Sequence, residues 1–509
     1  MTMLIFCGQL LLLGVVTLIA GYYIFLLPPK YPQNIPAIPF WVALLPFFKD
    51  VDQSEIFRTY IDKPLRTHGA VKLFFGAQWN ILVHRPSYMA QMFKEEDLYQ
   101  KSGNQKKIPH SVLAQFLGDN IISSHGAVWK DYQSVIKPGL QRNFEVEAIK
   151  KNADRLCLLL RQGQARAVKQ GVTVQDILQR YSVANCSEVL LQTDLNALSA
   201  ADSPINVLQT TVKREIFKPI FMNFPFLDRF PFPSRLRARR IVESFKHELQ
   251  HALLRSHEKL DSVESADRGM LGRRMLDAKQ SGQWTEKQLL DNLTVAFVAG
   301  QENPQLAMIS TLYLLAKHPE AQALLRDEIT SKDLDWSALS DRDNLPDMPY
   351  LTSVIYESLR LFPPIGQLIN RRTDADALLG DGLYVPKGTY LGYNCYSTNR
   401  DPVAWGPTAD DFDPARWGAS SEQINRHYRQ RRVKGEFISF HGGRRACLGE
   451  KFAMLQLRVT LMVLCRAFTW TLDPTWADRM TPAGPLYPRA LRLNFVERDE
   501  CSATNSERK

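Results

Sequence analysis

The sequence predicts a mainly helical protein with a minor β-sheet. Apolar residues recur at helical spacing over five long segments, at 144–170, 240–261, 285–317, 347–361 and 448–467. Shorter β-type runs predict a strand pair at 71–75 and 80–83 around Gly76, and a second group of strands within 368–393. The long helices dominate this pattern, and no internal repeat divides the chain.

The amino-terminal segment is strongly apolar, with no charged residue from Met1 to Pro29. At about 1.5 Å per residue, the run from Leu4 to Leu27 is long enough to cross a hydrocarbon core. A cleaved signal peptide is the alternative, but Tyr22 and Tyr23 stand where its small-residue cleavage site would fall. We therefore predict a single transmembrane helix at 1–29 that anchors the protein in the endoplasmic reticulum membrane. Because Lys and Arg are abundant after it, the body is expected on the cytosolic side.

Closely spaced prolines follow the anchor, at 28, 29, 32, 36 and 39. This spacing disfavours helix and predicts a stiff extended connector at 30–59. Periodic apolar segments then continue without a second linker, which predicts one large domain at 60–497. A polar tail occupies 498–509.

Cysteine spacing and net charge exclude several classes of protein. The seven cysteines form no CxxC pair, which argues against a disulfide framework, a zinc ribbon and c-type haem attachment. The formal charge of +10 would suit nucleic acid, anionic lipid or an acidic protein. Since the basic residues do not follow a recognised binding motif with stacking aromatic residues, we exclude nucleic acid as a partner.

One cysteine has a context suited to metal binding. Cys447 ends the stretch Phe440-His-Gly-Gly-Arg-Arg-Ala-Cys, just before the apolar helix predicted at 448–467. A helix N-terminus and nearby arginines lower a cysteine pKa, as a thiolate ligand requires. Gly443 and Gly449 let the backbone fold tightly and a flat macrocycle approach the sulfur. An ordinary buried cysteine beside a glycine-rich turn is the alternative interpretation.

The stretch resembles the cytochrome P450 signature FxxGxRxCxG at every fixed position, namely Phe440, Gly443, Arg445, Cys447 and Gly449. The resemblance implies the cytochrome P450 fold after the membrane anchor, with haem b bound and Cys447 as the axial ligand of its iron. It also implies dioxygen as oxidant and electrons from NADPH through a flavoprotein reductase. Arg445 would pair with a haem propionate, and Phe440 would cover the sulfur.

Other segments resemble the same family in the expected order. Glu357 and Arg360 stand at i and i+3 on one predicted helix, where they can pair. The family joins such a pair to a later arginine, which corresponds to Arg416. Arg371 occupies the position of a propionate-binding arginine, with Arg372 as the competing assignment. Trp129 corresponds to a tryptophan that donates to a propionate.

The expected arginine four residues after Trp129 is replaced by Gln133, and Lys130 and Lys137 are only possible substitutes. Propionate binding on that side is therefore an open point of the resemblance.

The segment Ala299-Gly300-Gln301-Glu302-Asn303-Pro304 falls where the family normally has an acid followed by threonine on the oxygen side of the haem. Ala299 and Gly300 are expected beside bound dioxygen. Asn303 cannot ionise but can position a water, which leaves Glu302 as the candidate for proton transfer. Pro304 lacks an N–H, so it frees the carbonyl of Gly300 and is expected to kink the helix.

This segment and Lys137-Pro-Gly-Leu-Gln141 resemble a fungal subgroup that includes dityrosine-forming cytochromes P450. The resemblance implies oxidation of a small aromatic secondary metabolite, by hydroxylation or oxidative phenol coupling. A reductase-independent haem-thiolate isomerase or dehydratase is the alternative enzyme. A non-catalytic membrane haem sensor is the alternative outside enzymes.

Two surface segments suggest partners. Residues 217–232 contain six phenylalanines and are followed by arginines, a pattern that favours contact with membrane lipid. A basic cluster at 426–434 precedes the cysteine loop and is interpreted as a docking surface for an acidic reductase.

Overall fold

The computed structural model describes residues 2–23, 27–76, 78–167, 170–261, 269–332 and 345–498. Its longer helices are α1 (Thr2–Gly21), α5 (Pro86–Lys94), α8 (Gly126–Gln141), α9 (Val146–Arg166), α10 (Val174–Asn185), α11 (Pro204–Ile216), α13 (Pro233–Asp261), α14 (Leu271–Gln280), α15 (Glu286–Lys317), α16 (Pro319–Ser331), α17 (Pro349–Leu361), α20 (Ser421–Val433) and α21 (Glu450–Ala467). Shorter ones are α2 (Leu45–Phe48), α3 (Gln53–Ile56), α4 (Lys63–His68), α6 (Asn104–Lys107), α7 (Val112–Leu117), α12 (Pro219–Asn223), α18 (Cys395–Thr398) and α19 (Pro402–Trp405).

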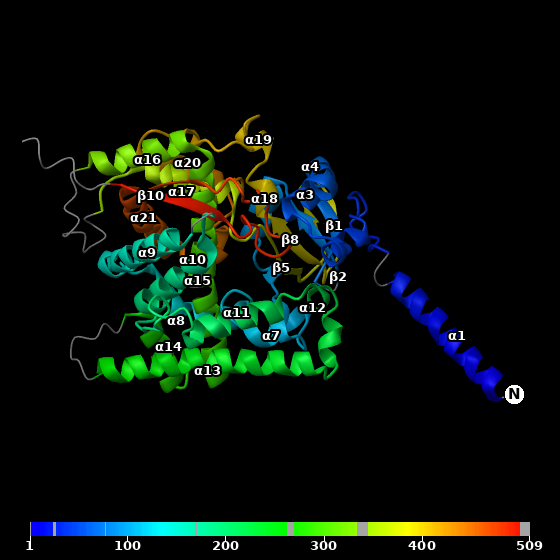
Figure 1. Ribbon diagram of the computed structural model, residues 1–509. Helices are drawn as coiled ribbons and strands as arrows, with labels where there is room; N and C mark the ends of the chain where they lie inside the picture. Colours follow the sequence, from blue (N-terminus) through cyan, green and yellow to red (C-terminus); the bar gives the residue numbers. More distant parts are fainter. Residues whose placement is uncertain are drawn as a thin grey trace, which may run out of the picture.

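The strands form small sheets; β1, β2, β5 and β8 lie at one side of the helical body, and β10 lies beside α17 and α21 at the other (Figure 1). They are β1 (Ala70–Phe75), β2 (Gln78–Val83), β3 (Tyr99–Lys101), β4 (Val172–Thr173), β5 (Gln367–Thr373), β6 (Ala377–Leu379), β7 (Leu383–Val385), β8 (Tyr390–Asn394), β9 (Phe468–Leu472) and β10 (Arg492–Glu497). The largest sheet has the order β1-β2-β8-β5-β3, in which β2 and β8 run parallel and the other neighbours run antiparallel. The predicted mainly helical class with a minor sheet is confirmed.

Helix α15 runs through the middle of the helical body (Figure 1). It begins at a capping box in which the Thr285 side chain and Gln288 bond each other's backbone. Its apolar residues face both of the large hydrophobic clusters, one formed mainly with α9, α10, α17 and α21 and the other with α8, α13 and α14. The helix continues through Pro304 without interruption. Burial on nearly all sides therefore fixes the segment that carries the expected oxygen-side residues.

The amino-terminal helix α1 projects away from the body (Figure 1), and apolar side chains such as Leu11, Leu12 and Leu18 are exposed on it. Among the residues that the structure describes, no helix combines the length and apolarity needed to cross a membrane. The transmembrane helix predicted at 1–29 is therefore not supported.

The expected connector at 30–59 is instead part of the folded body from Ile35 onward. Ile35, Ile38 and Val42 are buried, and the Ile38 N–H donates to the Lys72 carbonyl of β1 at 2.8 Å. Short helices α2 and α3 also lie in this range. The proline spacing prevents helix only before residue 40, and the apolar residues among the prolines bind the segment to the sheet. Of the polar tail, only Arg498 lies within the described residues.

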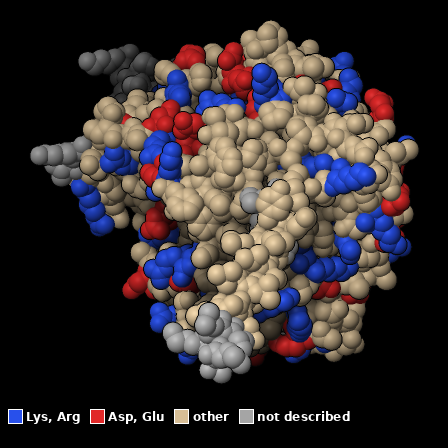
Figure 2. All heavy atoms as spheres, turned by 90° about the vertical axis from the view of Figure 1, so that its right-hand side faces the viewer, with Lys and Arg blue, Asp and Glu red and all other residues tan. Residues whose placement is uncertain are grey.

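The phenylalanine-rich segment 217–232 lies beside α2, where the rings of Phe47 and Phe224 are 6.4 Å apart. Phe226, Phe230 and Phe232 are exposed. Figure 2 views the side from which α1 leaves and shows neutral residues over its centre, with Lys and Arg mostly around the margin. The arginines after the segment do not all share this surface, because Arg235 is buried and pairs with Asp228.

Candidate active site

The loop before α21 holds Cys447 through tight backbone turns. The Cys447 N–H donates to the Phe440 carbonyl at 2.9 Å. Gly443 has φ +63°, and a Cβ there would lie 2.4 Å from the Phe93 carbonyl oxygen, so only glycine fits. The Phe440 ring is buried at the wall of the same cavity as Cys447.

The Cys447 residue is exposed where it borders this cavity, but protein atoms crowd around its thiol. Backbone N–H groups of Gly449 and Glu450 donate toward its sulfur and lower its pKa, but burial is the larger effect and raises the pKa to about 11. A metal ion bound at the sulfur would lower this pKa further.

A cavity of about 260 Å³ extends from Cys447 to α15. The part of its lining that comes from α15, from residues 121–122 and from residues 364–368 is here called the distal wall. It consists of Ile121, Ile122, Val295, Ala296, Ala299, Gly300, Asn303, Pro304, Ala307, Pro364, Ile365 and Leu368. Among these lining residues, Asn303 has the one polar side chain. A ligand packed against the distal wall therefore meets aliphatic groups and a single amide.

Basic side chains gather at one edge of the cavity. Arg371 and Arg445 both pair with Glu96, at 2.7 and 3.1 Å. The buried Lys101 Nζ lies 3.3 Å from His441 Nε2 and 3.3 Å from Asn370 Oδ1. Within the described ranges, Glu96 is the carboxylate that these cations contact, so the cluster carries an excess of positive charge.

Trp129 lies beside this cluster, with the Arg445 guanidinium carbon 4.6 Å from the centre of its ring. Gln133 lines the cavity, one turn further along α8. Lys130 is exposed, and Lys137 lines a separate basin on the outer side of the cysteine loop. Neither lysine therefore takes the place of the arginine that the family has where this chain has Gln133.

A buried ion network lies behind the cysteine loop. Arg360 donates to both carboxylate oxygens of Glu357 at 2.8 Å, and Arg416 Nε donates to Glu357 Oε1 at 2.8 Å. The Trp417 indole N–H donates to the other oxygen at 3.0 Å. Arg360 also donates to the Asn399 carbonyl at 3.0 Å. The network therefore connects α17 to the chain segments that precede the cysteine loop.

Comparison with known proteins identifies the family. The family model described as Cytochrome P450 matches residues 32–491. This chain belongs to the cytochrome P450 family. The resemblance drawn from the cysteine loop is thus confirmed.

The P450 is 41% identical to cytochrome P450-DIT2 of Saccharomyces cerevisiae over 92% of this chain and 94% of that protein. It is 37% identical to the cytochrome P450 monooxygenase xanG of Aspergillus fumigatus, over 88% and 84% of the two chains. The heme domain of cytochrome P450DA superposes with a TM-score of 0.71 at 18% identity, over 93% of this chain and 97% of that chain, which shows the common fold. The protein is a cytochrome P450 monooxygenase by family, and its relatives include fungal members.

The cavity of the P450 fits the haem that the family implies. Gly449 lines the cavity, yet a Cβ there would meet no protein atom within 4 Å, so glycine keeps space free beside the cysteine. The excess positive charge at Lys101, Arg371 and Arg445 would bind the two propionates of haem b. Cys447 would supply the thiolate to its iron. The basic side chains, the cysteine and the free space beside Gly449 are therefore all suited to haem b.

On the α15 side, the structure separates the expected residues into two groups. Ala299, Gly300 and Asn303 line the cavity. Glu302 is outside its lining and pairs with Lys213 of α11 at 3.1 Å. A Cβ at Gly300 would lie 2.9 Å from the sulfur of Cys186, so this glycine is needed for packing against the helix behind it.

Sequence reasoning did not find Lys101, Glu96 or His441. His441 stands inside the signature but at a variable position, and it has φ +61°, which is uncommon for a residue with a side chain. Nothing near Glu96 or Lys101 in the sequence distinguishes them from surface charges. Arg372, the competing assignment for Arg371, is exposed and donates to the Gly388 carbonyl at 3.2 Å.

Proposed function

We propose that this P450 uses dioxygen and two electrons from NADPH to oxidise a small phenol-bearing secondary metabolite, by hydroxylation or by oxidative coupling. The observation that carries the proposal is the distal wall, which is aliphatic except for the Asn303 amide. A flat aromatic ring can pack against such a wall, and one hydrogen bond can fix its hydroxyl group. The fungal relatives, one of which is a cytochrome P450 monooxygenase, support an oxidative role.

Asn303 would orient the substrate. Its side-chain N–H₂ donates to the Ala299 carbonyl at 3.4 Å, which leaves the amide oxygen as an acceptor for a phenolic O–H. A phenol ether of the same shape would leave that oxygen desolvated and unbonded, at a cost of about 1–3 kcal/mol. Haem held by Cys447 supplies the oxidising chemistry, and thiolate donation favours cleavage of the O–O bond. The aliphatic wall excludes water from the reacting ring.

Ligand titration and product analysis test the proposal. Purified holoenzyme should bind a small phenol more tightly than its methyl ether in optical titrations, and Asn303→Leu should remove the difference while keeping affinity for the ether. With a reductase and NADPH, the products should be hydroxylated or coupled phenols. Equal affinity for phenol and ether in the wild type would refute the role of Asn303. Oxidation restricted to aliphatic substrates would refute the substrate class.

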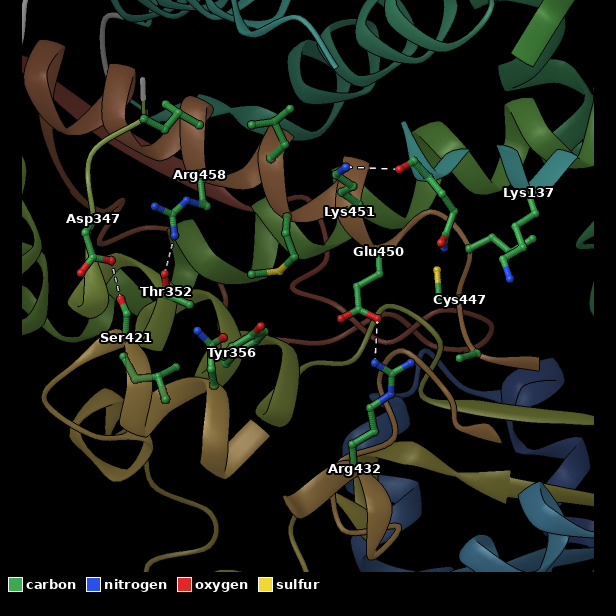
Figure 3. A pocket seen from close by; sticks show the side chains of 18 of the residues that line it. Lys137, Asp347, Thr352, Tyr356, Ser421, Arg432, Cys447, Glu450, Lys451 and Arg458 are labelled. Carbon is green, nitrogen blue, oxygen red and sulfur yellow. Dashed lines mark hydrogen bonds and ion pairs between the residues drawn. The ribbon is translucent and has the colours of Figure 1, made fainter. Parts of the chain in front are cut away.

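The electron donor in this proposal is a flavoprotein reductase, docked over a basin of about 890 Å³ on the outer side of the cysteine loop (Figure 3). Apart from the Arg432–Glu450 ion pair, the basin is lined by the basic side chains of Lys137, Arg444, Lys451 and Arg458 and by the acidic side chain of Asp347. An acidic partner surface would be attracted to this charge. The cluster at 426–434 contributes less, since Arg426, Arg431 and Arg432 already pair with carboxylates.

Reduction kinetics test the docking site. Lys137→Glu should slow haem reduction by the reductase several-fold at low salt. Added salt should reduce the difference in reduction rate between this variant and the wild type. Lys387→Glu, at an exposed turn after β7, serves as the matched control. Product formation that consumes no NADPH would instead favour the reductase-independent isomerase or dehydratase, and haem binding without any turnover would favour a sensor.

We also propose that the protein associates with the endoplasmic reticulum membrane, with its catalytic domain in the cytosol. The exposed apolar side chains of α1 and of the 217–232 segment support it. In fractionated cells the full chain should sediment with microsomes, and protease added outside should digest the body. Recovery of the full chain in the soluble fraction would refute the proposal.

A further inference from the structure

We propose that Tyr428 and Tyr356 form a built-in route by which an over-oxidised haem is reduced from the basin, so that the protein acts as a peroxidase toward donors on its outer surface. The inference rests on haem ligation by Cys447 and is independent of the substrate bound at the distal wall. Three features of the structure carry it: a short connection from Cys447, a stacked pair of tyrosines, and an opening of that pair to the basin.

Glu450 provides the connection. Its backbone N–H donates toward the Cys447 sulfur, while its side-chain Oε1 accepts the hydrogen bond of the Tyr428 hydroxyl. One residue therefore joins the cysteine to the phenol through two hydrogen bonds. Figure 3 shows Glu450 beside Cys447 and above Arg432, and Arg432 donates to its second carboxylate oxygen at 3.0 Å. This ion pair holds the carboxylate in place beside the tyrosine.

Tyr428 stacks on Tyr356 with 4.6 Å between ring centres and 2° between ring planes. A distance of 4.6 Å between the centres of parallel rings is typical of offset stacking, which brings the two π systems into contact. Tyr356 lines the basin directly (Figure 3). An electron taken from Tyr428 can therefore be replaced through Tyr356 by a donor in the basin.

The neighbouring tryptophans mark where this route ends. Trp417 lies 5.2 Å from Tyr356, and Trp405 follows at 5.4 Å. The Trp405 ring is flanked by the guanidinium groups of Arg360 and Arg431, whose carbons lie 5.0 and 4.6 Å from its centre. Two cations oppose a positive charge on that indole. Tyr428 avoids this penalty because it gives up its proton to Glu450 and forms a neutral radical.

The reaction balances as a peroxidase cycle. Hydrogen peroxide would oxidise the haem by two electrons as its O–O bond breaks and one molecule of water leaves; the second oxygen would leave as water once two electrons from the donor and two protons from solvent have been supplied. Tyr428 then returns one electron to the haem as its phenolic proton moves to Glu450. A donor in the basin gives an electron, the proton returns from Glu450, and the phenol is restored. A second round returns the haem to its ferric resting state.

Freeze-quench electron paramagnetic resonance on substrate-free holoenzyme mixed with hydrogen peroxide tests the route. The wild type should show a tyrosyl radical, and Tyr428→Phe should lose it. The Soret band of this variant should bleach faster, and ascorbate should protect it less. Tyr313→Phe is the matched control, because the Tyr313 hydroxyl also donates to a carboxylate, Asp478 at 2.8 Å, beside a tryptophan ring 5.9 Å away.

The control should keep both the radical and the protection by ascorbate. A second variant, Tyr356→Phe, should keep the radical on Tyr428 but slow its decay by ascorbate. A radical that survives in Tyr428→Phe, or bleaching that is equal in all four proteins, would overturn the proposal. The carbon monoxide difference spectrum, recorded for every variant, detects loss of thiolate ligation separately.

Discussion

Lys101 Nζ lies 3.3 Å from His441 Nε2, and both side chains are buried at the edge of the haem cavity. Burial, together with the charges of Arg371 and Arg445, lowers the pKa of Lys101 well below its usual value. The lysine therefore opposes folding of the haem-free chain and favours binding of an anionic group.

Replacing this lysine should act in opposite directions on the two forms of the protein. Lys101→Met should stabilise the haem-free chain by about 1–2 kcal/mol, because it removes a buried cation that repels its neighbours. It should also speed haem loss to an apoprotein scavenger. Lys107→Met, which removes a lysine bonded to Asn80 at 3.0 Å, should leave haem loss unchanged. Slower haem loss in Lys101→Met would contradict the assignment.

The Glu357 network should be essential to the fold. Arg360→Met leaves the fully buried Glu357 with fewer cationic partners and should cost about 3–5 kcal/mol. Urea unfolding and the yield of haem-loaded protein measure the loss. Arg426→Met removes an exposed pair with Glu422 and should cost about 0–1 kcal/mol. Similar losses in both variants would show that burial of the network is unimportant.

Packing between α15 and the helix behind it can be tested with a compensating pair. Gly300→Ala places a Cβ 2.9 Å from the Cys186 sulfur and should cost about 1–3 kcal/mol through overpacking. Cys186→Ala removes that sulfur, so the double variant should recover most of the loss. A double-mutant cycle from thermal unfolding measures the coupling, and strictly additive effects would rule out the contact.

Acid stability should depend on His84. Burial is the main cause that lowers its pKa to about 4; Asp401 and Asp62 raise it, while Arg66 and Arg85 lower it further. Below about pH 6.5 the unfolded chain binds a proton that the folded chain refuses, so stability should fall as pH drops from 6.5 toward 4. His84→Gln should flatten this part of the stability profile. His68→Gln, at an exposed position, should not.

The sequence was sufficient for the parts of the site that are local. The turn before Cys447 depends on glycines a few residues away, and the Glu357–Arg360 pair depends on helical spacing, so both follow from the chain order. Lys101 and Glu96 meet His441 only through the packing of the β3 region against the cysteine loop, which no spacing reveals.

Side-chain direction and electrostatic balance were also beyond the sequence. On a helix, Glu302 and Asn303 stand three and four residues after Ala299, so either can share its face. Packing against α11 decides the matter, since Lys213 pairs with Glu302. The pKa of Cys447 depends on the balance between burial, which raises it, and two backbone N–H groups, which lower it. The relative size of these two effects follows only from the three-dimensional structure. The role of residues 35–59 in the body required knowledge of the sheet on which they lie.

The Glu357 network also has a consequence for biosynthesis. Its partners, Asn399, Asp413, Arg416 and Trp417, all precede the cysteine loop in the chain. During translation this support can assemble before Cys447 leaves the ribosome. The nascent protein would then offer a preformed surface on which the cysteine loop and the chain after it could pack. Binding of the haem would be a late event in synthesis.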